Sequence, residues 1–217
     1  MRIDSFRETL LFMFSDAYII IKDGEAAALL DGLNSKLDGA PFDPVKSRIL
    51  SHSLSFYPDY TLYEVNDFDN SPSRVVSFIK GKDDLIYILD GTNEVIYGLN
   101  KLQPVQLTDD NITTYVRFFF HYVRGRFGRF NIVENIDDIR WREEPSPAGR
   151  KALGRMVEPL TLQNKDKEGG YHLKASIIFK DSLFESEVLV KKDGNVSLNN
   201  QEMLVEDIPV LDDHFQQ

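Results

Sequence analysis

The residues best suited to binding chemistry form a run of arginines in the second half of the chain. Two of them stand in a repeated Gly-Arg-Phe unit, at positions 125–127 and 128–130. Guanidinium groups make paired hydrogen bonds to carboxylates and phosphates, and they stack on flat rings. The run therefore predicts a pocket for an anionic small molecule. Four arginines make up the run, with no aspartate or glutamate between positions 117 and 133: Arg117, Arg124, Arg126 and Arg129.

His121 lies about one helical turn from Arg117 and from Arg124, so it could join the same pocket. The alternative is that the arginines are structural, because the dipole of a helix favours basic residues near its C-terminus. The chain also offers internal partners from position 201 onward, where acidic residues occur without any lysine or arginine. These acids are Glu202, Glu206, Asp207, Asp212 and Asp213.

No pattern predicts a catalytic residue, a metal site or a cofactor. The chain has no cysteine, which excludes disulfides, thiolate catalysis and cysteine-ligated metals. Its histidines are far apart and form no ligand pair at i, i+4 spacing. The triplet Ser51-His52-Ser53 has no identifiable acid to orient the imidazole. A non-catalytic protein is therefore the favoured interpretation over an enzyme.

Segment 88–92 reads Ile-Leu-Asp-Gly-Thr, and it resembles the first motif of the haloacid-dehalogenase-like phosphatases. In that family the nucleophilic aspartate stands two positions before the aspartate of the Asp-Gly-Thr triplet. Here that position holds Ile88, which cannot be phosphorylated. The same residues predict a turn, with Thr92 or Asn93 capping a short helix that ends near Leu102.

The arginine run must be positioned by the most strongly marked helix of the chain and by a strand that follows it. The helix is predicted from apolar residues on one stripe, and Gly125 is expected to end it in a left-handed conformation. A strand is expected from about Phe130 to Glu134. The stripe consists of Ile112, Tyr115, Val116, Phe119 and Val123.

The C-terminal third predicts an antiparallel β-meander. Apolar and polar residues alternate from Tyr171 to Phe179, a second strand follows, and Asp193-Gly194 is a two-residue hairpin signal. The predicted fold class is therefore α+β, with amphipathic helices packed on an antiparallel sheet. A curled version of this sheet would resemble the cystatin or NTF2-like rolls.

The N-terminal half is also predicted to be α+β. An opening helix is expected from about Ser5 to Phe14, an amphipathic helix from Glu25 to Leu37, and a shorter helix from Val45 to Ser53. Two or three antiparallel strands should follow before Leu89. We expect a single compact unit over residues 1–217, because no flexible linker divides the chain. The alternative is two lobes, 1–104 and 105–217.

Composition limits the function. Net charge is −10 at pH 7, which disfavours nucleic acid and anionic lipid as partners. No apolar stretch approaches the ~20 residues of a membrane helix. The N-terminus is interrupted by charges and has no small-residue cleavage site, so we expect a cytoplasmic protein. The leading hypothesis is a soluble binding or assembly protein, for which a homodimer is one form. The alternative is a hydrolase-like or anion-binding protein with an arginine-lined pocket.

Overall fold

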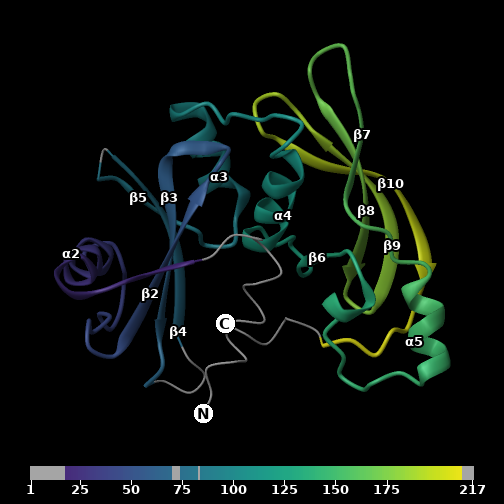
Figure 1. Cartoon of the computed structure of the whole chain (residues 1–217), viewed down its shortest axis with the longest axis horizontal. Helices are drawn as coiled ribbons and strands as arrows, with labels where there is room; N and C mark the ends of the chain where they lie inside the picture. The colour runs from purple at the N-terminus through teal and green to yellow at the C-terminus, as the bar shows by residue number, and fades with distance from the viewer. Residues whose placement is uncertain (1–17, 70–73, 83, 212–217) are drawn as a thin grey trace. The chain divides into compact units, whose positions relative to one another are not determined.

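Two antiparallel β-sheets and the helices packed on them make up the computed structural model of the chain, as Figure 1 shows. The structure describes residues 18–69, 74–82 and 84–211, so the predicted helix from Ser5 to Phe14 lies outside it. A first unit spans Phe14–Asp90, and a second unit contains Gly91–Gln217. The predicted α+β class is confirmed. The single unit over 1–217 and its two-lobe alternative stay predictions.

The first unit contains a five-stranded antiparallel sheet and one described helix. Each strand pairs with the next one along the chain, so the sheet is a simple meander. The two or three antiparallel strands predicted before Leu89 are confirmed as β3, β4 and β5. The elements are β1 (Ile19–Ile21), α2 (Asp23–Asn34), β2 (Ser47–Leu54), β3 (Tyr57–Asp67), β4 (Arg74–Gly81) and β5 (Ile86–Ile88).

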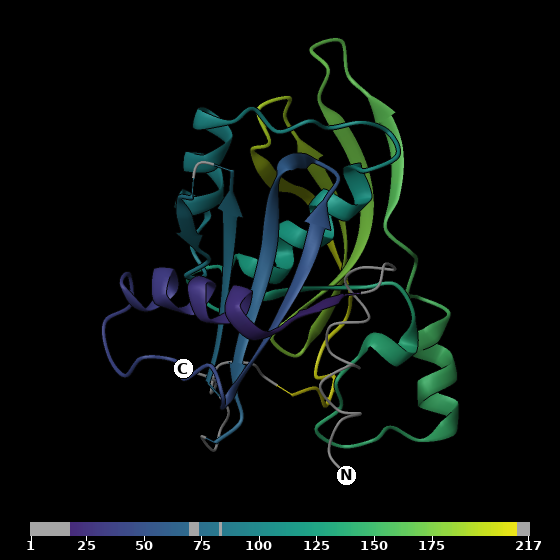
Figure 2. The ribbon, with the colours of Figure 1, turned by 60° about the vertical axis from the view of Figure 1, so that its left-hand side comes forward.

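Helix α2 packs across one face of this sheet, as Figure 2 shows. The sheet contributes one apolar residue from each of its three central strands: Ile49, Val65 and Phe78. Because side chains alternate along a strand, the neighbours of these residues lie on the other face. The buried stripe of the helix consists of Ala26, Leu29, Leu30 and Leu33.

The helix predicted from Val45 to Ser53 is wrong, because this segment forms β2. Its backbone pairs with β1 on one side and with β3 on the other. Its short apolar run fits a helix or a strand equally well in sequence, and the partners on both sides decide for the strand. Ile49 then packs into the α2 cluster at 1% exposure.

The second unit has a sheet of five strands centred on β8. Strand β9 pairs along one side of β8, while β7 and β6 pair with successive parts of its other side. The predicted C-terminal meander is confirmed by the order β8, β9, β10. The elements are α3 (Asn93–Leu102), α4 (Ile112–Tyr122), β6 (Phe130–Val133), a 3₁₀ turn (Ile136–Asp138), α5 (Pro147–Gly154), β7 (Thr161–Lys165), β8 (Tyr171–Phe179), β9 (Ser182–Val190) and β10 (Val196–Val205).

A buried polar network ties α3 and α4 to the hairpin between β9 and β10. The hydroxyl of Tyr115 donates to the carbonyl of Gly194 over 2.7 Å, and Asn100 Nδ2 donates to the same hydroxyl over 3.2 Å. Gly194 adopts φ +81° in a loop closed by the amide of Lys191, which donates to the carbonyl of Asn195 over 2.9 Å, so the loop is longer than the two-residue turn predicted at Asp193-Gly194. A Cβ there would lie 2.4 Å from Asn100 Nδ2, so only glycine fits.

An apolar cluster of this unit includes residues from β6, β8 and β9 and from the segment after β10. Ile178 and Leu183 contribute from the sheet, while Ile208 and Val210 contribute from that segment. Ser146 caps α5 by accepting from the amide of Gly149. Among the described residues, no helix has the length and apolar character needed to cross a membrane.

Candidate functional site

The candidate site is formed where α4 ends and the chain turns toward β6. Val123 is already extended, although its amide still donates to the carbonyl of Phe119 over 2.8 Å. The predicted left-handed stop at Gly125 is wrong, since the left-handed residue of this segment is Gly128 at φ +136°. The helix therefore passes directly into an extended segment that begins at Val123.

A tight turn at 125–128 sets the arrangement of the arginines. The amide of Gly125 donates to the carbonyl of Gly128 over 2.8 Å, and the reverse bond measures 3.2 Å. In an antiparallel pair of this kind, the residues one step outside lie opposite each other on the same side. These residues are Arg124 and Arg129. The turn thus places Arg124 and Arg129 on the two sides of its base.

The turn tolerates no side chain at its first glycine. A Cβ on Gly125 would lie 2.7 Å from Cε2 of Phe130 and 3.2 Å from the carbonyl oxygen of Gly128. Phe130 is itself fixed, because its ring stacks on Phe179 with the centroids 4.4 Å apart. The aromatic residue that follows the arginines therefore clamps the turn against β8.

His121 lies in the last turn of α4 and completes the group. Burial, then the nearby Arg129 and Arg124, lower the pKa of its imidazole to about 3. Near neutral pH the ring is uncharged, so it can donate one hydrogen bond without adding to the positive charge. Its ring also contacts Tyr122 edge-on, with the centroids 4.8 Å apart. We call His121, Arg124 and Arg129 the arginine-turn site.

Arg124 is the exposed member of this site. Its backbone amide donates to the carbonyl of Gly91 over 2.8 Å, and its Cδ lies 3.7 Å from the place where a Cβ on Gly91 would stand. Within residues 18–69, 74–82 and 84–211, no ion pair includes Arg124. Arg129 is half-buried beside it.

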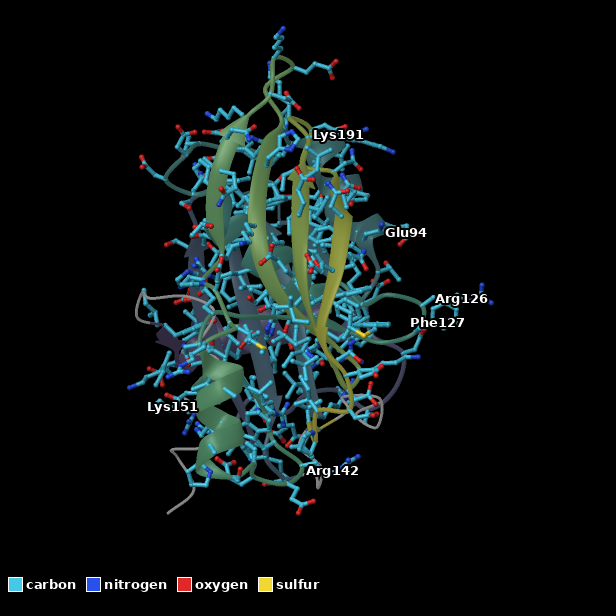
Figure 3. The ribbon with its side chains drawn as sticks, turned by 90° about the vertical axis from the view of Figure 1, so that its right-hand side faces the viewer. Glu94, Arg126, Phe127, Arg142, Lys151 and Lys191 are labelled. Atoms are coloured by element: carbon cyan, nitrogen blue, oxygen red, sulfur yellow. The ribbon has the colours of Figure 1, made fainter. Side chains whose placement is uncertain are left out.

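Arg117 and Arg126 lie apart from this group. Arg117 makes a paired contact with Glu134, from Nε over 3.1 Å and from Nη2 over 2.7 Å. Glu134 also accepts from the amide of Leu160, so this ion pair joins α4 to the β6 and β7 region. Arg126 stands at the tip of the turn with its guanidinium 5.5 Å from the ring centre of Phe127. Figure 3 shows the side chains of Arg126 and Phe127 projecting from the ribbon.

This arrangement of side chains can hold an anion. Two guanidinium groups and a neutral imidazole can together donate to the oxygens of a carboxylate or a phosphate. A histidine whose pKa is about 3 is a weak base at neutral pH, so it is poorly matched to proton transfer. In the described part of the chain, no group of three or more His, Asp or Glu residues could hold a metal ion.

His172 occupies a contrasting site on the polar face of β8. Its Nδ1 lies 2.7 Å from Oε1 of Glu187, and its Nε2 lies 3.6 Å from Oδ2 of Asp166. Glu187 above all, and then Asp166, raise the pKa of this imidazole. Asn200 donates to the other oxygen of Glu187 over 2.7 Å. His172 is therefore held as part of a cross-strand charge network.

Sequence reasoning missed a polar group on the first sheet. Glu64 and Asn66 are 3% and 1% exposed, and His52 is 5% exposed on the neighbouring strand. The alternation along β3 predicts that these polar positions face away from α2, but it does not predict that they are buried. Glu64 lies on the same face of the sheet as His52, whereas Ser51 and Ser53 lie on the opposite face.

No protein-family model, curated protein or solved structure matches this chain. The resemblance of the second sheet to a cystatin or NTF2-like roll therefore stays a prediction. The case for a function depends on the residues of this chain alone.

Proposed function

We propose that the second unit is a non-catalytic binding module that holds the carboxylate or phosphate of a small molecule at the arginine-turn site. The observation that supports this most directly is the turn at 125–128, in which Gly125 pairs with Gly128, so that Arg124 and Arg129 flank its base and both act on His121. Like charges placed opposite each other across a strand pair are destabilising. An anion bound between them removes this cost and gains charge-assisted hydrogen bonds.

Each member of the site has a distinct role in this proposal. Arg124 is exposed and acts as the movable clamp, while Arg129 is half-buried and fixed by the turn. His121 donates a hydrogen bond from the inner side without adding a third charge. Hydrogen bonds to charged groups contribute about 1.5–3 kcal/mol each. Loss of one guanidinium should therefore weaken binding by roughly tenfold to a hundredfold.

The overall charge of −10 fits a small anion better than a nucleic acid. A polyanion would meet the repulsion of the whole acidic surface, whereas a small molecule meets only the local field of the site. We propose that the protein acts inside the cell, in keeping with a chain that needs no disulfide.

Isothermal titration of the full chain with citrate, inorganic phosphate and a phosphorylated sugar tests the proposal. We expect saturable binding of at least one of the three at low salt. Arg124→Gln and Arg129→Gln should each weaken binding at least tenfold, while Arg126→Gln at the tip should leave it within twofold. Equal losses in all three variants would show that the anion senses general positive charge and would overturn the proposal.

Assembly is a second candidate, supported by a different residue. Phe127 is 62% exposed at the tip of the turn, with Arg126 beside it. Aromatic residues and arginines of this kind are enriched at protein–protein contacts. A homodimer formed through this tip should show a concentration-dependent mass in light scattering, and Phe127→Ser should abolish it. Leu102→Ser is the matched control, since Leu102 is 70% exposed in the same unit. A mass that stays monomeric at all concentrations counts against this candidate.

A further inference from the structure

His172 of β8 lies between two carboxylates that come from different parts of the second unit. Its Nδ1 lies 2.7 Å from Oε1 of Glu187 on β9, and its Nε2 lies 3.6 Å from Oδ2 of Asp166, the first residue after β7. We call residues 166–170, between β7 and β8, the hairpin tip. Figure 1 shows this hairpin projecting above the other strands of its sheet. His172 therefore connects the hairpin tip to the neighbouring strand β9.

Both carboxylates are held in place by other groups. Asn200 of β10 donates to Oε2 of Glu187 over 2.7 Å, so Glu187 presents its other oxygen to the imidazole. Oδ1 of Asp166 accepts from two backbone amides of the hairpin tip over 2.8 and 2.7 Å, so Oδ2 faces the imidazole. Neither carboxylate can turn away from His172 without losing these bonds.

The protonated form of His172 satisfies both carboxylates, and the neutral form does not. A neutral imidazole has one N–H donor and one acceptor nitrogen, whereas an ionised carboxylate only accepts. When the neutral ring keeps its proton on Nδ1 for the short contact to Glu187, the lone pair of Nε2 points at Oδ2 of Asp166. Attraction between opposite charges then becomes repulsion between two acceptors. In agreement with this geometry, Glu187 above all and then Asp166 raise the pKa of His172.

The other groups around His172 do not compete for its proton. Directly opposite the ring, β7 presents Asn164 and β9 presents Leu189, and neither side chain is charged. Lys174, two positions along β8, lies on the same face, but its Nζ lies 2.9 Å from each of two carboxylates. The charged residues near the ring, besides its own two carboxylates, are Lys174 with its partners Glu158 and Glu185, Lys167 and Glu168 in the hairpin tip, Lys191 after β9, and Glu202 on β10.

The base of the same hairpin is held on its opposite face. The hydroxyl of Tyr171 donates to the carbonyl of Leu107 over 3.0 Å, and Nζ of Lys165 lies 2.5 Å from Oδ1 of Asp109. Lysine and aspartate keep their charges through the range in which histidine titrates. Loss of the contact between His172 and Asp166 therefore frees the hairpin tip and leaves the base of the hairpin attached.

We propose that His172 is a pH-dependent switch that holds the hairpin tip against β9 when its imidazole is protonated and frees the tip when the imidazole is neutral. The strands stay paired in both states, and the contact between Nε2 and Asp166 is the one that changes. Histidine is the side chain that ordinarily titrates near neutral pH, so the switch responds in that range. The switch uses none of the residues of the arginine-turn site, so it operates whether or not that site binds an anion.

A spin label in the full chain tests this proposal. The chain has no cysteine, so a single introduced cysteine carries a nitroxide at one place. Lys167→Cys labels the hairpin tip, and Lys192→Cys labels the exposed loop between β9 and β10 as a matched control. Electron paramagnetic resonance spectra are compared at about pH 5.5 and about pH 9, on either side of the histidine range. The mobile fraction at position 167 should rise roughly twofold or more at the higher pH, while that at 192 stays constant.

Two variants of the tip-labelled chain separate a switch from a structural contact. His172→Gln has no charged form, so the label should be mobile at both pH values. Asp166→Asn keeps Oδ1 for the tip amides but presents an N–H donor to the ring, so the response should reverse: the neutral ring accepts from it and the protonated ring repels it. Far-UV circular dichroism checks that both variants keep their sheets.

The proposal is overturned by an unchanged mobile fraction at position 167, by an equal rise at 167 and 192, or by a normal response to pH in either variant. A normal response in His172→Gln would mean that another group controls the hairpin tip. A normal response in Asp166→Asn would mean that the tip does not depend on the charge facing Nε2.

Discussion

The arginine-turn site and the buried polar residues of the first sheet differ in how the chain builds them. The arginine-turn site comes from one continuous segment, because a single turn brings Arg124 and Arg129 together beside the end of α4. The buried polar group of the first sheet is assembled from separate strands, with His52 on β2 and Glu64 and Asn66 on β3. The first presents at least one exposed cation, whereas the second buries its polar groups. A contiguous site is visible in sequence, and a polar group made by strand register is not.

The two units also differ in how they treat buried polar groups. In the second unit, the amide of Asn111 accepts from the amide of Thr108 and donates to the carbonyl of Gln106, both over 2.8 Å. Tyr115 likewise has partners for its hydroxyl. In the first unit, Asn66 has none for its side-chain amide. The paired groups stabilise the fold, and the unpaired amide of Asn66 destabilises it.

The largest expected effect comes from overfilling the satisfied network of the second unit. Gly194→Ala should lower the free energy of unfolding by about 3 kcal/mol or more, because it combines backbone strain at φ +81° with contacts to fixed atoms. Gly169→Ala is the control, since φ there is +87° but nothing lies within 4 Å. It should cost about 1 kcal/mol. Urea denaturation measures both, and equal losses would show that packing around Gly194 adds nothing.

A matched pair of asparagines tests the contrast between the units directly. Asn111→Val should lower the free energy of unfolding by about 2 kcal/mol, because it removes two hydrogen bonds and leaves the amide of Thr108 and the carbonyl of Gln106 without these partners. Asn66→Val should raise it by about 1–2 kcal/mol, because it removes an unpaired amide from a central strand. Chemical denaturation of both variants measures the two signs. If both variants lost a similar amount of stability, the contrast between the paired Asn111 and the unpaired Asn66 would be wrong.

The histidines provide a pH test with opposite signs. The folded pKa of His121 is about 3 and its ordinary value is 6.5, so the unfolded chain binds more protons between these values. Stability should therefore fall as the pH drops from 6.5 toward 3, with a slope from this group of at most about 1.4 kcal/mol per pH unit. His172 has a raised pKa, so its contribution is present below 6.5 and is lost as the pH rises through its folded pKa.

Proton NMR of the imidazoles measures this directly. The signal of His172 should titrate above pH 6.5, while that of His121 should not titrate until the acid limit of the fold. A saturating anion should raise the pKa of His121, because a negative charge nearby favours the protonated ring. His121 titrating near 6.5 without ligand would contradict a neutral imidazole in the arginine-turn site.

Sequence periodicity predicts most elements of this fold because local patterns determine them. The alternation from Tyr171 to Phe179 gives β8, and the stripe from Ile112 to Val123 gives α4. The prediction fails where a short apolar run has no decisive period. Segment 47–54 becomes a strand only because β1 and β3 flank it, which is a tertiary effect.

The arginine-turn site is also partly readable from sequence. The types and spacing of the arginines predict an anion site, but they do not separate Arg124 and Arg129 from Arg117, whose partner Glu134 is seventeen positions away. The burial of polar residues on the first sheet cannot be predicted from the sequence. Glu64 and Asn66 follow the pattern of a solvated strand face, and burial of that face depends on what packs over it.

The smallest expected effect concerns the repulsion within the arginine-turn site. Arg124→Gln should raise the free energy of unfolding by a few tenths of a kcal/mol at low salt, because it separates two like charges held across a turn. The gain should vanish near 1 M salt, where the screening length falls to about 3 Å. Arg126→Gln at the exposed tip should change stability at neither salt concentration. Differential scanning calorimetry at both concentrations measures the effect. A loss of stability for Arg124→Gln would mean that this arginine serves the fold, as Arg117 does, and is not held in place for an anion.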